Sequence, residues 1–174
     1  MIIFSYSLYQ FCIYNMYILY TQYIGNFRCS VIALYSPFGF LYWKIIPNTT
    51  NALIFQDFVL EIEQNFQLSP DAFCILDNCA IHKTRDSILV LENVFRGQWR
   101  NLAAYSPDWN PIELGFSQVK RILRRYENNY LVDPLTSINA AFYLYSTNGA
   151  RSFRAMGNWN KYRRNYIFYN DIFV

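Results

Sequence analysis

A short, continuous apolar run at residues 72–76, which ends at Asp77-Asn78, is the feature that most restricts the fold. A run of this kind is typical of a strand buried inside a sheet. Apolar stripes at helical spacing lie on either side of it, at residues 50–66 and 84–95. Strands that alternate with helices indicate an α/β fold. The pattern therefore predicts a mixed sheet with flanking helices and places the Asp77 carboxylate at the carboxyl end of a strand.

The segments upstream predict a β-hairpin and a helix. Residues 29–35 and 40–46 are β-rich, and Ser36-Pro37-Phe38-Gly39 between them places proline and glycine where a type I turn favours them. Thr50 is expected to cap the helix over residues 50–66. The apolar stripe of this helix comprises Ile54, Phe55, Phe58, Val59, Ile62 and Phe66.

The second half of the chain predicts three helices and one further strand. The first helix covers residues 84–95, and residues 102–105 are the candidate strand. A long helix follows, with Asn110 as its N-cap and Pro111 at its first position, and residues 133–145 form the last helix. The expected core positions are Ile88, Leu91 and either Val94 or Phe95 in the first helix, Ile112, Phe116, Val119, Leu123 and Tyr126 in the long one, and Leu135, Ile138, Ala141 or Phe142 and Tyr145 in the last.

The composition agrees with one folded, reduced domain. Of 174 residues, 53% are hydrophobic and 20% aromatic, which excludes disorder over most of the chain. The four cysteines show no C-x-x-C spacing and there is one histidine, so no Cys/His zinc site is expected. The net charge of +3 permits a polyanionic partner without requiring one. An intracellular protein is the simplest interpretation.

Residues 1–27 carry no charged side chain and are long enough to span a bilayer. Polar residues such as Ser5, Gln10 and Asn15 interrupt the stretch, and it has no basic n-region or small-residue cleavage site. We therefore expect an apolar, aromatic leader or strand at residues 1–27, followed by one domain over residues 28–174. Membrane attachment is the less favoured alternative.

Asp77 and Glu113 are the residues best placed for chemistry. Asp77 follows a buried strand, and Glu113 lies in the first turn of the long helix. Two such carboxylates can converge on Mg²⁺, which prefers oxygen ligands, and a pair of ions can promote phosphodiester displacement. A structural alternative stays open: Glu113 would bond back to Asn110 in a capping box, and Asp77-Asn78 would be a turn.

Two blocks of sequence carry a resemblance to a known family. They read Leu76-Asp77-Asn78-Cys79-Ala80-Ile81-His82 and Tyr105-Ser106-Pro107-Asp108-Trp109-Asn110-Pro111-Ile112-Glu113. Both resemble the signature blocks of DDE superfamily endonucleases, the mariner-like transposases, in the family's order and interval. The hairpin and the first helix are similar in position too, so the resemblance covers about residues 28–160.

The resemblance implies an RNase H-like fold in which Asp77 and Glu113 are the second and third members of a metal-binding acidic triad. In the family the first acid lies on the opening strand, just before a hairpin, but residues 1–56 contain no Asp or Glu. Asp57 lies within the first helix and cannot replace it. We therefore expect a domain without its opening strand, incomplete at the N-terminus, and a two-metal Mg²⁺ or Mn²⁺ site that is impaired.

Other residues are given supporting roles. His82 matches a histidine of the family pattern and is expected to support the site rather than bind the ion, because Mg²⁺ selects oxygen. Asn78 and Asn110 are expected to organise local turns. The long helix also carries a basic face that either contacts DNA phosphates or is simply solvated. Its residues are Lys120, Arg121, Arg124 and Arg125.

The function implied by the resemblance is metal-dependent cleavage and transfer of transposon DNA. Its partners would be transposon ends and target DNA, its assembly a homodimer, and its location the nucleus if the source is eukaryotic. Without the first acid, we expect this chain to be inactive. Two alternatives stay open: a non-catalytic DNA-binding or protein-interaction remnant, and a small membrane-associated protein anchored by residues 1–24.

Overall fold

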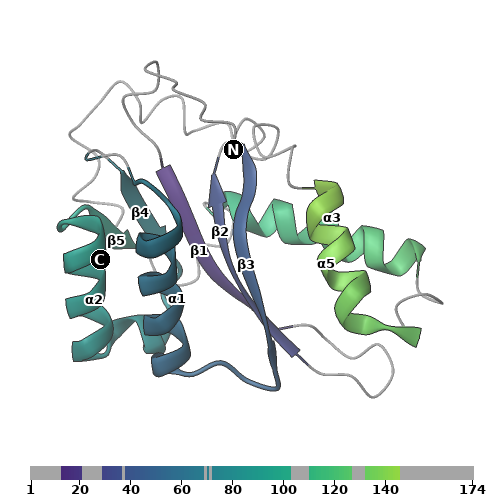
Figure 1. Cartoon of the computed structure of the whole chain (residues 1–174), viewed down its shortest axis with the longest axis horizontal. Coiled ribbons are helices and arrows are strands. Elements are labelled where there is room, and N and C mark those ends of the chain that lie inside the picture. Colours follow the sequence, from purple (N-terminus) through teal and green to yellow (C-terminus); the bar gives the residue numbers. More distant parts are fainter. Residues whose placement is uncertain are drawn as a thin grey trace.

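The computed structural model is a five-stranded sheet with helices on both faces (Figure 1). It describes residues 13–20, 29–36, 38–68, 70, 72–102, 110–126 and 132–145. The strands are β1 Ile13–Tyr20, β2 Cys29–Ser36, β3 Gly39–Pro47, β4 Phe73–Leu76 and β5 Trp99–Asn101. The helices are α1 Ala52–Asn65, the 3₁₀ helix η1 Ala80–Lys83, α2 Arg85–Phe95, α3 Pro111–Arg125 and α5 Pro134–Tyr145. The predicted α/β class is confirmed.

β1 is the central strand of the sheet, whose order is β3-β2-β1-β4-β5. It pairs antiparallel with β2 and parallel with β4. The expectation that the opening strand is missing is therefore wrong: residues 13–20, within the stretch that the sequence predicts to be an apolar leader or strand, form the central strand. The rest of that stretch, residues 1–12 and 21–27, lies outside the described residues.

The β2–β3 hairpin forms where the sequence predicts it. Gly39 begins β3 with a φ of 119°, a conformation that favours glycine. The Phe38 amide donates to Ser36 Oγ at 3.0 Å within the turn. Every residue of β2 is buried, and successive side chains along it enter two different cores, because side chains alternate between the faces of a sheet.

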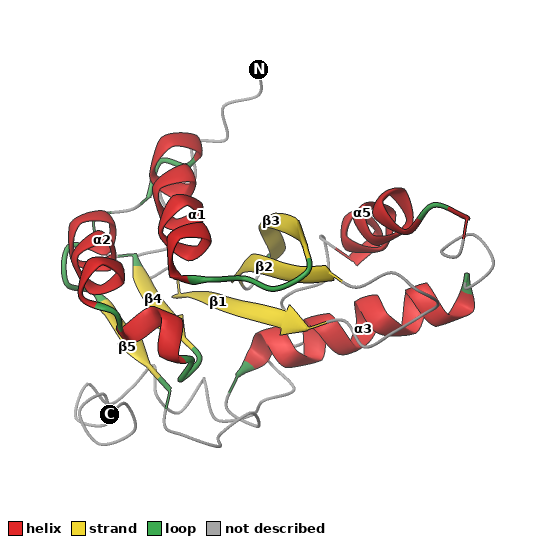
Figure 2. Cartoon of the chain, turned by 90° about the horizontal axis from the view of Figure 1, so that it is seen from below, coloured by secondary structure: helices red, strands yellow, loops and turns green. Residues whose placement is uncertain are grey.

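α1 and α2 cover one face of the sheet (Figure 2). Asn51 rather than Thr50 caps α1, since its Oδ1 accepts a hydrogen bond from the Ile54 amide at 3.0 Å. In α2 Ile88 is exposed, contrary to the prediction, because Ser87 takes the inward position one residue earlier. The buried side chains of the two helices are Phe55, Phe58, Val59, Ile62, Ser87, Leu91, Val94 and Phe95.

α3 and α5 cover the opposite face. Their buried apolar side chains include Ile112, Phe116, Val119, Leu123, Ile138, Ala141 and Phe142. Tyr126 and Leu135 are exposed, contrary to the prediction; Tyr126 follows the last residue of α3, and Leu135 lies in the first turn of α5. The closest packing is at Gly115, where a Cβ would lie 3.0 Å from ring atoms of both Tyr35 and Phe40.

β5 lies earlier in the chain than the strand predicted at residues 102–105. It pairs parallel with β4, with Asn101 opposite Leu76. Leu102 follows the strand, and its amide donates to the Leu76 carbonyl oxygen at 2.7 Å. Residues 103–105 lie outside the described residues. The shift brings Asn101, rather than a later residue, to the end of β4.

The sequence predicts reduced cysteines and makes membrane attachment the less favoured alternative. Cys29, Cys74 and Cys79 are free thiols, and burial raises the pKa of the Cys74 thiol well above its usual value. In the described ranges, no helix combines the length and the apolar character that crossing a bilayer requires.

Replacing Gly115 by Ala is expected to lower the free energy of unfolding by about 1–3 kcal/mol, the usual cost of overpacking a core. At an exposed helix position the same change would instead raise it by up to about 1 kcal/mol. Urea unfolding followed by circular dichroism measures the difference. Ser117→Ala, on the exposed side of the same helix, is the matched control. A Gly115→Ala variant as stable as the unmodified chain would contradict the close packing.

Candidate functional site

Asp77 lies at the carboxyl end of β4, as the sequence predicts. β4 itself lies between β1 and β5, and its last three residues are fully buried. The Asp77 side chain is 21% exposed. Its Oδ1 atom is buried and accepts no well-aligned hydrogen bond from the described residues. One carboxylate oxygen therefore has unused acceptor capacity at the end of a rigid strand.

The central strand beside Asp77 carries no acidic residue. β1 pairs with β4 in a register that sets Met16 opposite Leu76, so the next positions in line are Tyr17 and Asp77. Tyr17 is also opposite Ala33 of β2. A strand thus exists at the place where a third carboxylate could join Asp77, but its sequence, Ile13–Tyr20, supplies none.

His82 folds back from η1 onto Asp77. Its Nδ1 atom lies 3.2 Å from the Asp77 carbonyl oxygen and 2.9 Å from Asp77 Oδ1. The imidazole is fully buried, and its centroid is 4.3 Å from that of the Phe55 ring in α1. Nε2 has no hydrogen-bond partner among the described residues. The histidine is therefore an internal neighbour of the carboxylate rather than a surface residue of a loop.

Ser87 ties η1 to the two helices beside it. Its hydroxyl donates to the Ile81 carbonyl oxygen at 2.8 Å. It accepts hydrogen bonds from Thr84 Oγ1 at 2.7 Å and from Gln56 Nε2 at 3.1 Å. Since Ser87 is fully buried, these bonds connect α1, η1 and the start of α2 away from water. Sequence reasoning had no signal for this network, because it joins residues distant along the chain.

Glu113 lies in the first turn of α3 and is half-buried. Asn110 occupies the N-cap position as predicted, but only its main chain caps the helix: its carbonyl oxygen accepts from the Glu113 amide at 3.1 Å. α3 contacts β1 and begins beneath that strand in Figure 2. Asp77 and Glu113 thus belong to two elements, β4 and α3, that both contact the central strand.

Several side-chain oxygens around these elements are buried and have no hydrogen-bond partner in the described structure. They are Asp77 Oδ1, Asn78 Oδ1, Asn101 Oδ1 and Asn110 Oδ1. Buried polar atoms are normally paired, so unpaired oxygens need an ion or water. Carboxylate and amide oxygens are ligands that Mg²⁺ and Mn²⁺ accept, so the donor chemistry fits a hard divalent cation.

Asn101 is the member of this set that sequence reasoning missed. It was missed because the strand was expected at residues 102–105, so Asn101 was not expected to be the last residue of a strand. Asn78 and Asn110 were expected to organise turns, yet their side-chain oxygens accept no hydrogen bond in the described structure. Within the same ranges, no three His, Cys, Asp or Glu side chains gather closely enough to hold a metal ion.

The basic residues of α3 lie in its C-terminal half. Lys120 is half-buried, whereas Arg121, Arg124 and Arg125 are exposed. Arg124 and Arg125 are in the last turn, where positive charge also complements the helix dipole. This position is compatible with phosphate binding and with a solvated helix end. The later basic residues, from Arg151 to Arg164, lie outside the described residues.

Comparison with solved structures shows which fold this is. The catalytic domain of the Mos1 mariner transposase has a TM-score of 0.57 at 16% identity, with 86% of this chain and 77% of that chain covered. The mariner Mos1 paired end complex with Mg has a TM-score of 0.59 at 14% identity, with 87% and 54% covered. A simian T-cell lymphotropic virus intasome has a TM-score of 0.58 at 13% identity, with 75% and 46% covered. The mixed sheet is therefore RNase H-like.

Comparison with family models identifies the sequence itself. No curated protein matches the chain. The model of the DDE superfamily endonucleases matches residues 19–131, from the end of β1 to just before α5, and so includes Asp77, His82 and Glu113. Because this match covers well over half of the sequence and the fold agrees with it, the chain belongs to the DDE superfamily endonuclease family.

Proposed function

We propose that the chain is a DDE transposase domain that binds transposon DNA and a divalent cation but does not cleave DNA as it stands. The observation that carries this proposal is the composition of β1. The strand occupies the centre of the sheet beside Asp77, and none of its residues is acidic. The family's activity, cleavage and transfer of transposon ends, is the reaction from which this chain would have departed.

Asp77 and Glu113 would be the principal ligands of the cation, with Asn78 and Asn110 as neighbouring oxygen donors. The buried, unpaired oxygens of Asp77, Asn78 and Asn110 and the absence of sulfur ligands from this set favour Mg²⁺ or Mn²⁺. Structures of the similar Mos1 catalytic domain were solved with Mg and with Mn. When bound, such ions activate an attacking oxygen and stabilise the leaving oxygen in phosphodiester displacement.

Ligand count is the reason for the proposed inactivity. Two carboxylates can hold one cation, whereas in-line displacement requires both the attacking and the leaving oxygen to be stabilised. Misplacement by about 1 Å already costs on the order of a hundredfold in rate. β1 offers no carboxylate beside the end of β4, where a further acidic ligand is needed.

The purified chain is expected to nick transposon-end DNA with Mg²⁺ or Mn²⁺ no faster than an Asp77→Ala, Glu113→Ala double variant. Gel assays on labelled duplexes over a range of metal concentrations measure the rate. Clear metal-dependent nicking that either single substitution abolishes would overturn the proposed inactivity while supporting both ligands.

Adding an acidic side chain to β1 tests the same explanation. Tyr17→Asp should tighten Mn²⁺ binding, because it adds a carboxylate in line with Asp77, and Tyr17→Asn should not. The two side chains have nearly the same size, so the pair separates charge from shape. Equal Mn²⁺ affinity of the two variants, measured by electron paramagnetic resonance, would show that position 17 is not the place of the missing ligand.

DNA is the partner that the charge of α3 favours. Three exposed arginines and Lys120 can neutralise phosphates without reading sequence. In addition, several of the similar structures are transposase assemblies with transposon ends. We therefore propose DNA binding through this helix, inside the cell and in the nucleus of a eukaryotic source.

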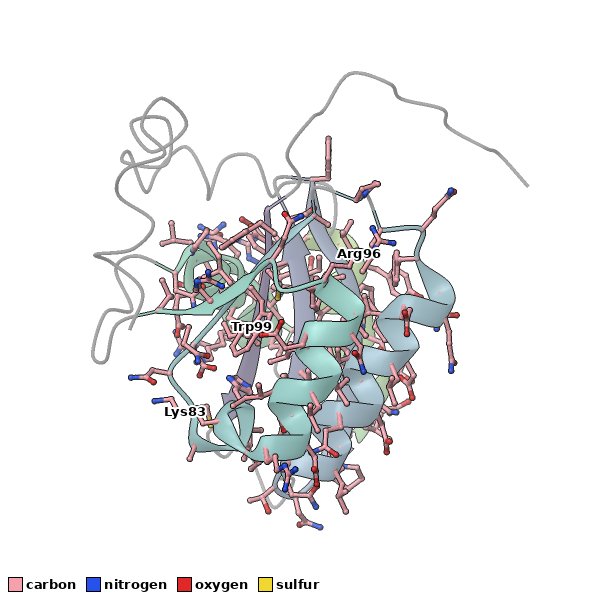
Figure 3. The ribbon with its side chains drawn as sticks, turned by 90° about the vertical axis from the view of Figure 1, so that its left-hand side faces the viewer. Lys83, Arg96 and Trp99 are labelled. Carbon is pink, nitrogen blue, oxygen red and sulfur yellow. The ribbon has the colours of Figure 1, made fainter. Side chains whose placement is uncertain are left out.

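The Lys120→Ala, Arg124→Ala variant is expected to bind unrelated duplexes more weakly and to flatten the plot of log K against log salt by about 1–2 units of slope. Fluorescence anisotropy at several salt concentrations measures this. The control removes two charges elsewhere, Arg96→Asn with Arg100→Gln; Arg96 lies at the end of α2 opposite to Lys83 and η1 (Figure 3). Asn suits the left-handed backbone of Arg96, whose φ is 52°. Equal slopes for both variants would assign α3 to a solvated surface.

A further inference from the structure

We propose that His82 is a positioning residue that fixes both the main chain and the carboxylate of Asp77 for cation binding. The inference rests on the proposed function, in which Asp77 is a metal ligand. His82 would not touch the ion itself. It would act by holding Asp77 in one conformation before the ion arrives.

The contact between the two residues joins the imidazole to two parts of Asp77. Nδ1 donates to the Asp77 carbonyl oxygen at 3.2 Å, and the same atom lies 2.9 Å from Oδ1 without a well-aligned hydrogen bond to it. The first contact fixes the backbone where β4 ends. The second favours one side-chain rotamer by charge and dipole attraction, yet leaves the lone pairs of Oδ1 available to a cation.

The contacts of His82 indicate which ring nitrogen is the donor. The side chain is fully buried, and Nε2 has no hydrogen-bond partner among the described residues. A proton on Nε2 would create a buried, unpaired donor, which is costly, whereas an unpaired lone pair is tolerated more easily. The tautomer with its proton on Nδ1 therefore fits these contacts, and it is also the tautomer that can donate to Asp77.

The surroundings of His82 make it a rigid support. Phe55 of α1 packs against the imidazole with ring centroids 4.3 Å apart. At the preceding residue, the Ile81 carbonyl oxygen accepts a hydrogen bond from the Ser87 hydroxyl, which in turn accepts one from Gln56. Contacts with α1 and α2 thus fix the position of His82. Through His82, these two helices also fix the position of the carboxylate at the end of β4. Outer partners of this kind typically change metal affinity by about 10–100-fold when removed.

Two substitutions separate the hydrogen bond from the packing. His82→Phe keeps an aromatic ring against Phe55 but has no donor, and His82→Asn keeps an N–H near the place of Nδ1 but loses the ring. In the full chain, His82→Phe is expected to weaken Mn²⁺ binding about tenfold, and His82→Asn is expected to stay within about threefold of the unmodified chain. Electron paramagnetic resonance titration measures free Mn²⁺, and urea unfolding shows whether each variant folds.

An Asp77→Ala variant distinguishes the two levels of the proposal. If it binds Mn²⁺ as tightly as the unmodified chain, Asp77 is not a ligand and the proposed function fails together with this inference. If Asp77→Ala weakens binding but His82→Phe does not, only the positioning role is overturned. A loss in His82→Phe that His82→Asn restores supports the role, because a purely packing role would follow the aromatic ring instead.

The unmodified chain offers a test that does not depend on any variant folding. His82 is the only histidine in the sequence, so ¹⁵N–¹H correlation spectra contain one set of imidazole signals. The expected pattern is that of a ring with a proton on Nδ1. A ring whose Nδ1 carries no proton in the folded protein cannot donate to Asp77 through that atom and would overturn the proposal.

Discussion

The sheet depends on the backbone hydrogen bonds of β1, because this strand is the partner of both β2 and β4. Without it the antiparallel hairpin and the parallel pair β4–β5 would be two separate pieces, each with an unpaired edge. The pairing also determines where the helices lie, since α1 and α2 pack on one face and α3 and α5 on the other. A strand without any charged side chain thus performs the structural role of the opening strand while offering no carboxylate to the site.

In β1, the backbone supports the fold although the side chains lack the acidic group that metal binding would require. Backbone pairing requires main-chain groups, which nearly any non-proline residue supplies, whereas metal binding requires particular side chains. The sheet can therefore form although β1, which pairs with β4, has no acidic residue. Around Asp77, the buried contacts of His82 and Ser87 still fix the end of β4. The Asp77 carboxylate is therefore held in place by its neighbours, but the adjacent strand β1 offers it no acidic partner.

Local patterns predicted the elements whose signals are local. The hairpin followed from two β-rich runs around a proline–glycine turn, β4 from an apolar run, and α3 from a proline at the first helical position. The errors arose where two short signals compete or where a neighbour decides. Asn51 and Thr50 are both residues that can cap a helix, and the pairing with β4 places β5 at Trp99–Asn101, before the predicted strand. For residues 1–27 the sequence left a leader and a strand as alternatives, because a central strand is defined by what pairs with it.

The sequence by itself determined the family, the order of helices and strands, the positions of Asp77 and Glu113 at element ends and the absence of acids before Asp57. These properties depend on residue identity and on spacing along the chain, which the sequence contains in full. Only the tertiary structure decided that residues 13–20 are the central strand, that His82 is buried against Asp77 and that Ser87 links η1 to α1. The pairing of β1 and the Gln56–Ser87 hydrogen bond join segments that are separate in sequence, and the burial of His82 depends on Phe55 of α1. Such contacts follow from packing and hydrogen bonding across the folded chain rather than from any local pattern.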